Sequence, residues 1–249
     1  KPSDLSEYLL AEQLKPEFKR FAQYADKIKV RDYVSSKGLA DILPKVYQVV
    51  KDANQIDFDA LPDRFVLKTN HGCGSHIICR DKSLLNKNEA ITSLNKTVKT
   101  IYSTIEPHYK YIEPVIYAEE FIDDKKHQVP VDYKFMVSRG EIINIMVCTD
   151  REIEVKFAIY DTNWKNMSDI WVYKKYRPEK GIAKPKNFDR MMLIAKTLGA
   201  DFDLVRVDLY DTDEAVFFSE LTFTPAGGYI GYYTNFALKE VYKSIAKNL

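Results

Sequence analysis

A spacing of three to four residues between apolar positions recurs in four parts of this chain and predicts amphipathic helices. Pro16 interrupts the first of them, while Asp26 and Gly38 mark the start and the end of the second. Asn187 is expected to cap the last helix, and Gly199 to end it. The predicted helices cover residues 4–25, 26–38, 88–105 and 187–199.

Shorter runs rich in β-branched and aromatic residues predict strands between and after these helices. No Gly/Ser-rich linker and no internal repeat separates residues 4–50 from the rest of the chain. The predicted strands cover residues 43–50, 65–67, 77–79, 115–122, 131–137 and 142–147, and further strand-like segments cover residues 155–160 and 171–177.

A hairpin is predicted near the C-terminal end, where two strand-like runs (206–210 and 215–222) flank an acidic turn. Alternation places Arg206 and Asp208 on one face of the first strand, and Glu220 and Thr222 on one face of the second. Pairing through the short turn would set Asp208 beside Glu220. Two adjacent carboxylates repel unless a cation lies between them, and Mg²⁺ is the natural candidate. The alternative is two unrelated acids on a solvated face.

A glycine-containing turn follows the strand at residues 65–67. Lys68 ends that strand, and Gly72, Cys73, Gly74 and Ser75 follow closely. Glycines let the backbone approach a phosphate, and a lysine at the base of such a turn adds a point charge. An ordinary hairpin turn explains the same residues. The segment is not a P-loop, because neither a GK[ST] sequence nor a helix follows.

The same stretch offers a second interpretation, a zinc site. His71, Cys73, His76 and Cys79 supply four possible ligands in nine residues. Structural zinc sites usually combine a C-x₂₋₄-C pair with a distant second pair. Here the ligand types interleave and no second cluster exists, which disfavours zinc.

Two polar residues alternate on the predicted strand at 131–137. In a cleft, Asp132 could hold a ribose hydroxyl and Lys134 a phosphate, whereas on an exposed sheet they would be a same-face pair. After the acidic hairpin, residues 224–228 (Thr-Pro-Ala-Gly-Gly) are expected to form a flexible loop beside Asp208 and Glu220.

Composition excludes several classes of protein. The chain has 249 residues, and its net charge of +1 gives no field that would attract nucleic acid or an anionic membrane. No apolar run approaches the ~20 residues of a membrane span, and the first residues do not resemble a signal peptide. The three cysteines lack a disulfide framework, which favours a reducing compartment and hence a cytoplasmic location.

Five fragments, in this order, resemble the TupA-like ATP-grasp proteins, which are found with bacterial surface-polysaccharide biosynthesis. The resemblance runs from about Phe18 to Tyr233 and implies an α+β ATP-grasp fold, in which two α/β subdomains clasp ATP between antiparallel sheets. We therefore expect a helical segment (1–25), then an ATP-grasp domain (26–249) with a glycine-loop subdomain (about 62–120) and a metal and phosphate subdomain (121–235). The fragments are 25–34, 65–74, 118–122, 132–135, and 207–210 with 219–225.

The resemblance also implies a nucleotide site. By position, Lys27 and Lys68 would contact the ATP phosphates, Asp132 would hold the ribose, and Lys134 would reach a phosphate. The loop over the triphosphate would comprise Gly72, Cys73, Gly74 and Ser75. The adenine would be lined by Glu119, Glu120, Phe121 and Ile122.

The implied metal ligands are Asp208 and Glu220, for two Mg²⁺ ions or alternatively Mn²⁺, with Arg206 facing the transferred phosphoryl group. Thr222 stands where the family usually has an asparagine. A hydroxyl is the poorer ligand, so one metal site would be weak or completed by water. Only about 25 residues precede Asp26, so little or no N-terminal domain is available to bind the acceptor, and we expect residues 150–185 to do so.

These features together predict an ATP-dependent carboxylate–amine ligase that works through an acyl phosphate. Its partners would be a small-molecule or glycan-linked carboxylate and an amine, with no nucleic acid and no membrane span, and the oligomeric state is left open. The alternatives are an ATP-grasp kinase that phosphorylates a small molecule or sugar, and a nucleotide-binding protein without catalysis.

Overall fold

The computed structural model of the chain describes residues 1–72, 74, 76–100, 103, 105–125, 129–149 and 154–248. The α-helices are α1 (Leu5–Gln13), α2 (Ala22–Ala25), α3 (Val30–Ser36), α4 (Lys87–Val98), α5 (Ser168–Trp171), α6 (Phe188–Gly199) and α7 (Asn235–Asn248). The strands are β1 (Val46–Val50), β2 (Phe65–Thr69), β3 (His76–Cys79), β4 (Ile116–Glu120), β5 (Asp132–Ser138), β6 (Glu141–Thr149), β7 (Lys156–Tyr160), β8 (Val205–Asp211) and β9 (Val216–Thr222). Short 3₁₀ turns join them: η1 (Pro16–Phe21), η2 (Ala40–Ile42), η3 (Ala53–Gln55), η4 (Lys82–Leu84), η5 (Pro107–Tyr111), η6 (Lys174–Tyr176) and η7 (Pro225–Gly228).

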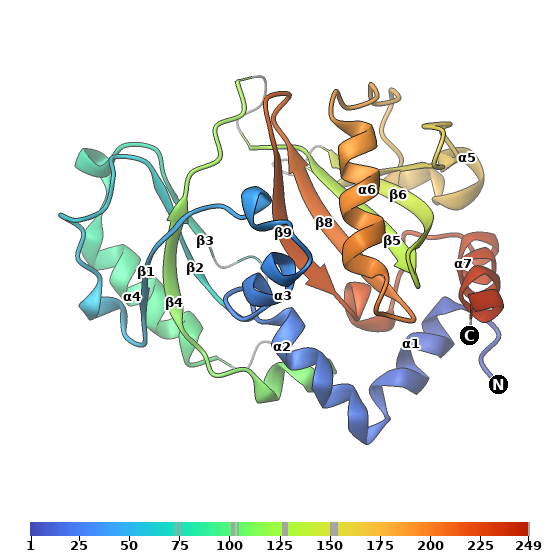
Figure 1. Cartoon of the computed structure of the whole chain (residues 1–249), viewed down its shortest axis with the longest axis horizontal. Coiled ribbons are helices and arrows are strands. Elements are labelled where there is room, and N and C mark those ends of the chain that lie inside the picture. Colours follow the sequence, from blue (N-terminus) through green and yellow to red (C-terminus); the bar gives the residue numbers. More distant parts are fainter. Residues whose placement is uncertain are drawn as a thin grey trace.

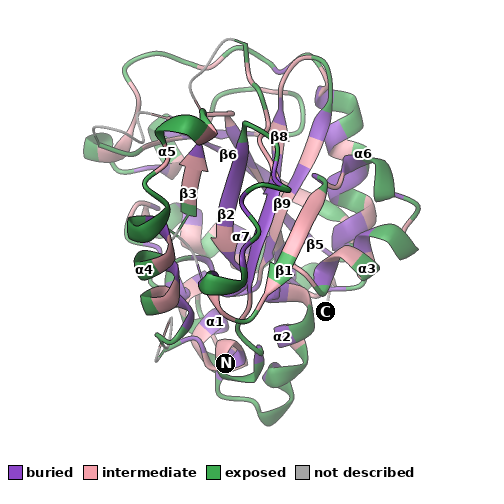
Figure 2. Ribbon diagram, turned by 90° about the vertical axis from the view of Figure 1, so that its left-hand side faces the viewer, coloured by how far each residue is buried: buried purple, intermediate pink, exposed green. Residues whose placement is uncertain are grey.

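The strands form two separate antiparallel sheets (Figure 1). The four-stranded sheet has the order β1-β4-β2-β3, and the five-stranded sheet has the order β7-β6-β5-β8-β9. The four-stranded sheet and α4 form the left part of the molecule in Figure 1, and the five-stranded sheet lies at its centre with α6 against it. The central strands are buried, whereas the outward faces of the helices are exposed (Figure 2).

Alternation along the strands divides the five-stranded sheet into two chemically different faces. Phe135 and Val137 of β5 pack against α6 on one face. Lys134 and Met136 point to the other face, where Met136 belongs to a buried cluster that includes residues of α1 and α7. One end of this second face is therefore apolar and covered by helices, and the other end carries the polar residues.

The four-stranded sheet follows the same rule. Phe65 and Leu67 of β2 pack with Leu94 of α4 in one apolar cluster. The intervening residue Lys68 lies on the opposite face, as does Glu119 of β4, which is paired with Val66. Each sheet thus has one face bound to a helix and one face that carries charged side chains.

The N-terminal helix belongs structurally to the far end of the chain. Leu5 and Leu9 of α1 share a buried cluster with Val241 of α7. The rings of Tyr8 and Tyr242 lie 5.9 Å apart. Interruption of the first helix at Pro16 is confirmed, because η1 begins at that residue.

Several details differ from the sequence predictions. Helix α4 ends at Val98 rather than at residue 105, and Ile101, Tyr102 and Thr104 of that prediction lie outside the described residues. The prediction of a strand-like segment at 171–177 is wrong, because α5, an extended Val172 and η6 occupy this region.

Two further predictions are corrected at the ends of elements. Asn187 precedes α6, but its side chain does not cap the helix and donates instead to Asp211 Oδ1 at 2.8 Å. Within residues 224–228, which were expected to form a flexible loop, Pro225–Gly228 form η7, and Pro225, Gly227 and Gly228 are buried. Helix α7 was not predicted. No helix in the described ranges is long and apolar enough to cross a membrane.

Candidate active site

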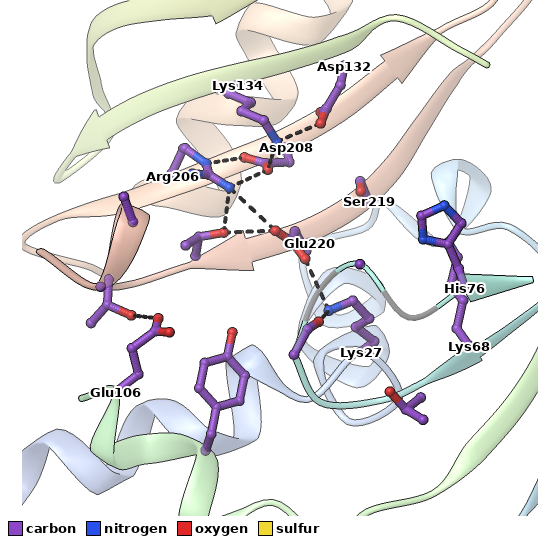
Figure 3. Close-up of a pocket in the computed structure, with 18 of the residues that line it drawn as sticks. Lys27, Lys68, His76, Glu106, Asp132, Lys134, Arg206, Asp208, Ser219 and Glu220 are labelled. Carbon is purple, nitrogen blue, oxygen red and sulfur yellow. Dashed lines mark hydrogen bonds and ion pairs between the residues drawn. The ribbon is translucent and has the colours of Figure 1, made fainter. Parts of the chain in front are cut away.

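A cavity of about 470 Å³ is lined by residues from both sheets and from the segments that connect them (Figure 3). The charged faces of the two sheets contribute Lys68 from β2, Asp132 and Lys134 from β5, and the β8–β9 hairpin. Lys27 comes from the turn before α3, and Glu106 from the segment before η5. Four basic side chains and four carboxylates line the cavity within the described part of the chain: Lys27, Lys68, Lys134 and Arg206, with Glu106, Asp132, Asp208 and Glu220.

The β8–β9 hairpin forms in the predicted register, with Asp208 opposite Glu220 and Arg206 opposite Thr222. Arg206 donates two hydrogen bonds of 2.7 Å to Asp208, from Nε to Oδ1 and from Nη2 to Oδ2. Nη2 also donates to Thr222 Oγ1 at 3.0 Å and lies 3.4 Å from Glu220 Oε1. The neighbouring acids are therefore held together by a cation of the protein itself.

A second cation reaches Asp208 from the adjacent strand. Strand β5 pairs with β8 so that Lys134 lies opposite Asp208. Lys134 Nζ bonds to Asp208 Oδ2 and lies 2.6 Å from Asp132 Oδ2. Asp208 is fully buried. It is neutralised from two sides.

Lys27 links the glycine turn to the hairpin. Asp26 positions it, because its Oδ1 accepts hydrogen bonds from the backbone N–H groups of Ile28 and Lys29 at 2.9 and 3.2 Å. Lys27 Nζ then donates to the Gly72 carbonyl at 2.6 Å and lies 3.1 Å from Glu220 Oε2. The side chain thus joins the two halves of the cavity.

The glycine turn has the backbone geometry that its sequence predicts. Gly72 and Gly74 have φ angles of 77° and 80°, in the left-handed region that favours glycine. Asn70 holds the base of the turn, because its Oδ1 accepts from Val115 N at 2.8 Å and its Nδ2 donates to the Glu113 carbonyl at 3.0 Å. Cys73 and Ser75 lie outside the described residues.

A smaller, more apolar pocket of about 100 Å³ adjoins the cavity and shares Lys68, His76 and Tyr210 with it. All four predicted adenine-lining residues line this pocket, together with Val66, Ile78, Val129 and Pro130: Glu119, Glu120, Phe121 and Ile122. The Arg64 guanidinium lies 4.2 Å from the centre of the Phe121 ring. The pocket therefore combines apolar walls with a fixed aromatic ring.

Lys68 and Lys134 are charged in spite of their burial. Burial alone would lower the pKa of Lys68, but its ion pair with Glu119 raises that pKa above its ordinary value. Burial would also lower the pKa of Lys134, but the charges of Asp132 and Asp208 outweigh burial and raise that pKa. Burial would raise the pKa of Glu220, but Lys27, Lys134 and Arg206 hold it well below its usual range. The site is thus a network of mutually neutralising charges.

The sequence placed residues 224–228 beside Asp208 and Glu220, but it missed the segment that faces them at the end of the cavity away from the apolar pocket. Ile105, Glu106 and Tyr109 line this end from one side, and Thr224, Ala226 and Gly227 of the η7 region line it from the other. No described residue in the range 150–185, where the acceptor site was expected, lines this cavity. No local motif marks Glu106, because the two segments meet only in the folded chain.

Metal binding was tested on the donor atoms present. Within the described residues, no group of three or more His, Cys, Asp or Glu side chains could hold a metal ion as the side chains stand. For zinc, His71 is buried against the Thr100 carbonyl and Cys79 against the Asp63 carbonyl, while Cys73 lies outside the described residues. For Mg²⁺, the oxygens of Asp208, Glu220 and Thr222 face one cavity and are the hard donors that this ion prefers, although cations of the protein now engage them. The donor set fits Mg²⁺ and does not favour zinc.

Two antiparallel sheets with a charged cavity between them, a glycine turn above it and an apolar pocket beside it define an ATP-grasp protein. The chain belongs to the TupA-like ATP-grasp family, whose model, described as TupA-like ATPgrasp, matches residues 7–241. The predicted family resemblance is confirmed. None of the curated proteins matches this chain.

Solved structures show the same fold. The L-amino acid ligase from Bacillus licheniformis has a TM-score of 0.54 at 14% identity, covering 90% of this chain and 50% of that one. A D-alanine–D-alanine ligase from Bacillus anthracis has a TM-score of 0.50 at 16% identity, covering 90% and 67%. The D-cycloserine synthetase DcsG has a TM-score of 0.50 at 11% identity, covering 91% and 71%.

At these identities the likeness concerns the fold alone, and it confirms the predicted α+β ATP-grasp fold. The chain spans only half the length of the first of these ligases.

Proposed function

We propose that this protein is an ATP-dependent ligase that joins a carboxylate to an amine. The observation that carries the proposal is the chemistry of two adjoining pockets. An apolar pocket suited to a nucleobase adjoins a cavity in which four basic side chains are interleaved with carboxylates, two of them on paired positions of one hairpin, and whose lining also includes Glu106 and Thr224. The apolar pocket would take the base of a nucleotide, the basic side chains its phosphates, the adjacent carboxylates a metal ion, and the rest of the cavity an acceptor. The match to the TupA-like ATP-grasp family supports it.

In this proposal the adenine occupies the smaller pocket, beside Phe121 and the 119–122 backbone. Asp132 holds the ribose. Lys27, Lys68 and Lys134 exchange their present carboxylate partners for phosphate oxygens, and the 72–75 turn covers the triphosphate. Lys68 and Lys134 are already ionised for this exchange, and a metal ion would have to neutralise the carboxylates that Lys27 and Lys134 release.

The released carboxylates, Asp208 and Glu220 with Thr222, hold Mg²⁺. Two ions fit the proposal, and Mn²⁺ is an alternative. When bound, the metal neutralises charge on the phosphates. Arg206, which already spans Asp208, Glu220 and Thr222, faces the phosphoryl group as it moves to the carboxylate of the substrate. Its fixed guanidinium stabilises the charge that develops there.

The chemistry then proceeds in two steps. A carboxylate oxygen of the substrate attacks the γ-phosphorus of ATP, ADP leaves, and an acyl phosphate forms. The amine, in its neutral form, attacks the acyl carbon, the bond from carbon to the phosphate oxygen breaks, and inorganic phosphate leaves as the nitrogen gives up a proton to water and the amide forms. Positioning and charge neutralisation supply the catalysis. We further propose a uronic-acid or amino-acid carboxylate of a bacterial surface polysaccharide as substrate and a cytoplasmic location, on the family resemblance alone.

Nucleotide binding is the first test. We expect a non-hydrolysable ATP analogue to bind the wild-type protein in a Mg²⁺-dependent manner by calorimetry. The Lys68→Ala variant should bind about tenfold or more weakly, the size of one charge-assisted contact. Lys51→Ala is the matched control, because Lys51 is exposed and pairs with Glu113 away from the cavity. Equal affinity for wild type and Lys68→Ala would contradict this site.

Product analysis tests the reaction. A ligase supplied with ATP, Mg²⁺ and a panel of carboxylates releases inorganic phosphate only when an amine is added. A kinase, the alternative that uses the same nucleotide site, leaves a stable phosphorylated product and needs no amine.

A further inference from the structure

Glu106 occupies the far end of the cavity. It is 9% exposed, and its backbone N–H donates to Ser103 Oγ at 3.1 Å. Its carboxylate accepts a hydrogen bond from the Thr224 hydroxyl across the two segments that close this end. In Figure 3, Glu106 lies on the opposite side of the view from Lys68 and His76, with Arg206 and Glu220 between.

Glu106 differs from the other carboxylates of the cleft. Asp132 and Asp208 are paired with Lys134, Glu220 with Lys27, and Glu119 with Lys68. Within the described ranges of the chain, no lysine, arginine or histidine forms an ion pair with Glu106. The nearby Arg206 is committed to Asp208 and Thr222. A carboxylate this deeply buried normally has a cationic partner.

The surroundings of Glu106 make this imbalance larger. Burial raises the pKa of its carboxyl, hydrogen bonds from Thr224 and Ser103 oppose this, and the charge of Glu220 raises the pKa further while that of Arg206 lowers it. Ile105 and Gly227 close the same end of the cavity with apolar atoms, and a Cβ on Gly227 would lie 2.7 Å from Ile105 Cδ1. The site is narrow, partly apolar and short of one positive charge.

We infer that Glu106 and Thr224 form the subsite that binds the protonated amine of the acceptor. The inference rests on the proposed function and deepens it, because it specifies the acceptor as a primary ammonium compound such as an amino acid or an amino sugar. The ammonium group supplies the missing cation, and Thr224 fixes the carboxylate that receives it. Arg206 and Glu220 separate this subsite from the apolar pocket, which places the amine beside the group to be transferred.

Direct binding tests the inference without turnover. The probes are glycinamide, which carries an ammonium group, and glycolamide, which carries a hydroxyl group at the same position. Both are titrated by ligand-observed NMR into protein saturated with Mg²⁺ and the ATP analogue. We expect the wild-type protein to bind glycinamide more tightly by about tenfold or more, as expected for one charge-assisted hydrogen bond. Equal binding of the two probes, or no binding of glycinamide, would overturn the inference.

Variants assign the preference to Glu106. Glu106→Gln keeps the shape and still accepts from Thr224, and we expect it to lose the preference for glycinamide. Thr224→Val should weaken the preference while leaving the charge in place. Glu113→Gln, at an exposed glutamate that pairs with Lys51, should behave like wild type. A preference that persists in Glu106→Gln would overturn the assignment.

A trapping assay separates this inference from the proposed function. Hydroxylamine is largely uncharged at neutral pH and attacks acyl phosphates, so hydroxamate formation from ATP and the carboxylate panel reports carboxylate activation alone. If hydroxamate forms but the protein does not prefer the ammonium probe, the Glu106 inference is refuted and the ligase proposal stands. If the protein prefers the ammonium probe but no hydroxamate forms, the ligase proposal is refuted and the ammonium subsite stands.

Discussion

Asp208 is the residue on which the proposed metal dependence turns. It lies fully buried between Arg206 and Lys134. Burial raises its pKa, whereas the two cations act in the opposite direction. Its charge therefore has two alternative uses, to neutralise these side chains or to bind a metal ion.

Asp208→Asn should separate these uses. The variant releases Arg206 and Lys134 for phosphate and removes a metal ligand. We expect calorimetry to show that the ATP analogue binds without Mg²⁺ at least as well as to wild type, and that Mg²⁺ improves binding by about tenfold less than in wild type. Asp203→Asn, at an exposed acid paired with Arg139, is the control. Glu220→Gln repeats the test if the first variant is unstable, and unchanged Mg²⁺ stimulation in both would refute the ligand assignment.

His108 predicts a pH dependence of stability. Its ring is 1% exposed and packs 5.5 Å from the ring of Phe18. Burial lowers its pKa from 6.5 to about 4. Below pH 6.5 the unfolded chain therefore binds a proton that the folded protein does not bind until about pH 4. The contribution of His108 to the free energy of unfolding is therefore complete above pH 6.5 and is lost as the pH falls towards 4.

We expect His108 to account for a loss of about 2 kcal/mol between pH 7 and pH 5. Urea unfolding at the two pH values measures it. His108→Phe keeps an aromatic ring beside Phe18 but cannot titrate, so its loss over the same interval should be smaller by that amount. The carboxylates titrate in both proteins and cancel in the comparison. Identical pH profiles would show that His108 is not the group responsible.

At the scale of elements, the fit of α6 against the five-stranded sheet depends on Gly199. A Cβ at this position would overlap Val137 of β5, whose Cβ would be 2.7 Å away. Alanine favours a helix by up to ~1 kcal/mol over glycine, but overpacking a core costs about 1–3 kcal/mol. At Gly199 the cost of the steric overlap with Val137 therefore exceeds the gain in helix propensity.

Gly199→Ala should lower the free energy of unfolding by about 1–3 kcal/mol in a urea titration. Gly231→Ala is the control, because no atom of the described residues lies within 4 Å of an added Cβ there. In the double variant with Val137→Ala, space is restored, and the total loss should be less than the sum of the two single losses. A fully additive result would place the strain elsewhere.

Elements whose partners are adjacent in sequence were the most predictable. The β8–β9 hairpin, with Asp208 opposite Glu220, follows from alternation and a short turn. Lys134 and Asp208 are 74 residues apart, so only the family resemblance placed them in one site, and their direct contact was not predicted. The strand predicted at 171–177 was wrong because the aromatic and β-branched residues there suit a strand, although Trp171 ends a helix and Val172 packs beside α7. Glu106 has no local signature at all.

At the scale of the molecule, the two sheets are held by different packing but share one cavity. Lys27 crosses between them, bonded to the Gly72 carbonyl on one side and to Glu220 on the other. The far end of the cavity is also tied to the start of the chain, because Gln13 Nε2 lies 3.4 Å from the Gly227 carbonyl. The packing of α1 therefore supports η7 and, through it, the proposed amine subsite.

Leu9→Ala tests whether α1 is part of the cooperative fold. Leu9 is 2% exposed in the cluster that joins α1 to α7. Truncating such a side chain costs about 2–5 kcal/mol, so the urea midpoint should fall while the slope of the transition stays unchanged. Leu14→Ala, at a leucine that is 85% exposed, should unfold like wild type. A wild-type midpoint for Leu9→Ala would mean that α1 frays independently.

The contact between α1 and α7 also governs the order of folding during synthesis. Helix α1 leaves the ribosome early, whereas α7 is made only after both sheets have been translated. Until then Leu5 and Leu9 lack Val241, one of the residues that bury them. We therefore expect the two sheets to fold first and α1 to dock last, so that a nascent chain stopped before residue 235 exposes the apolar side chains of α1 to chaperones.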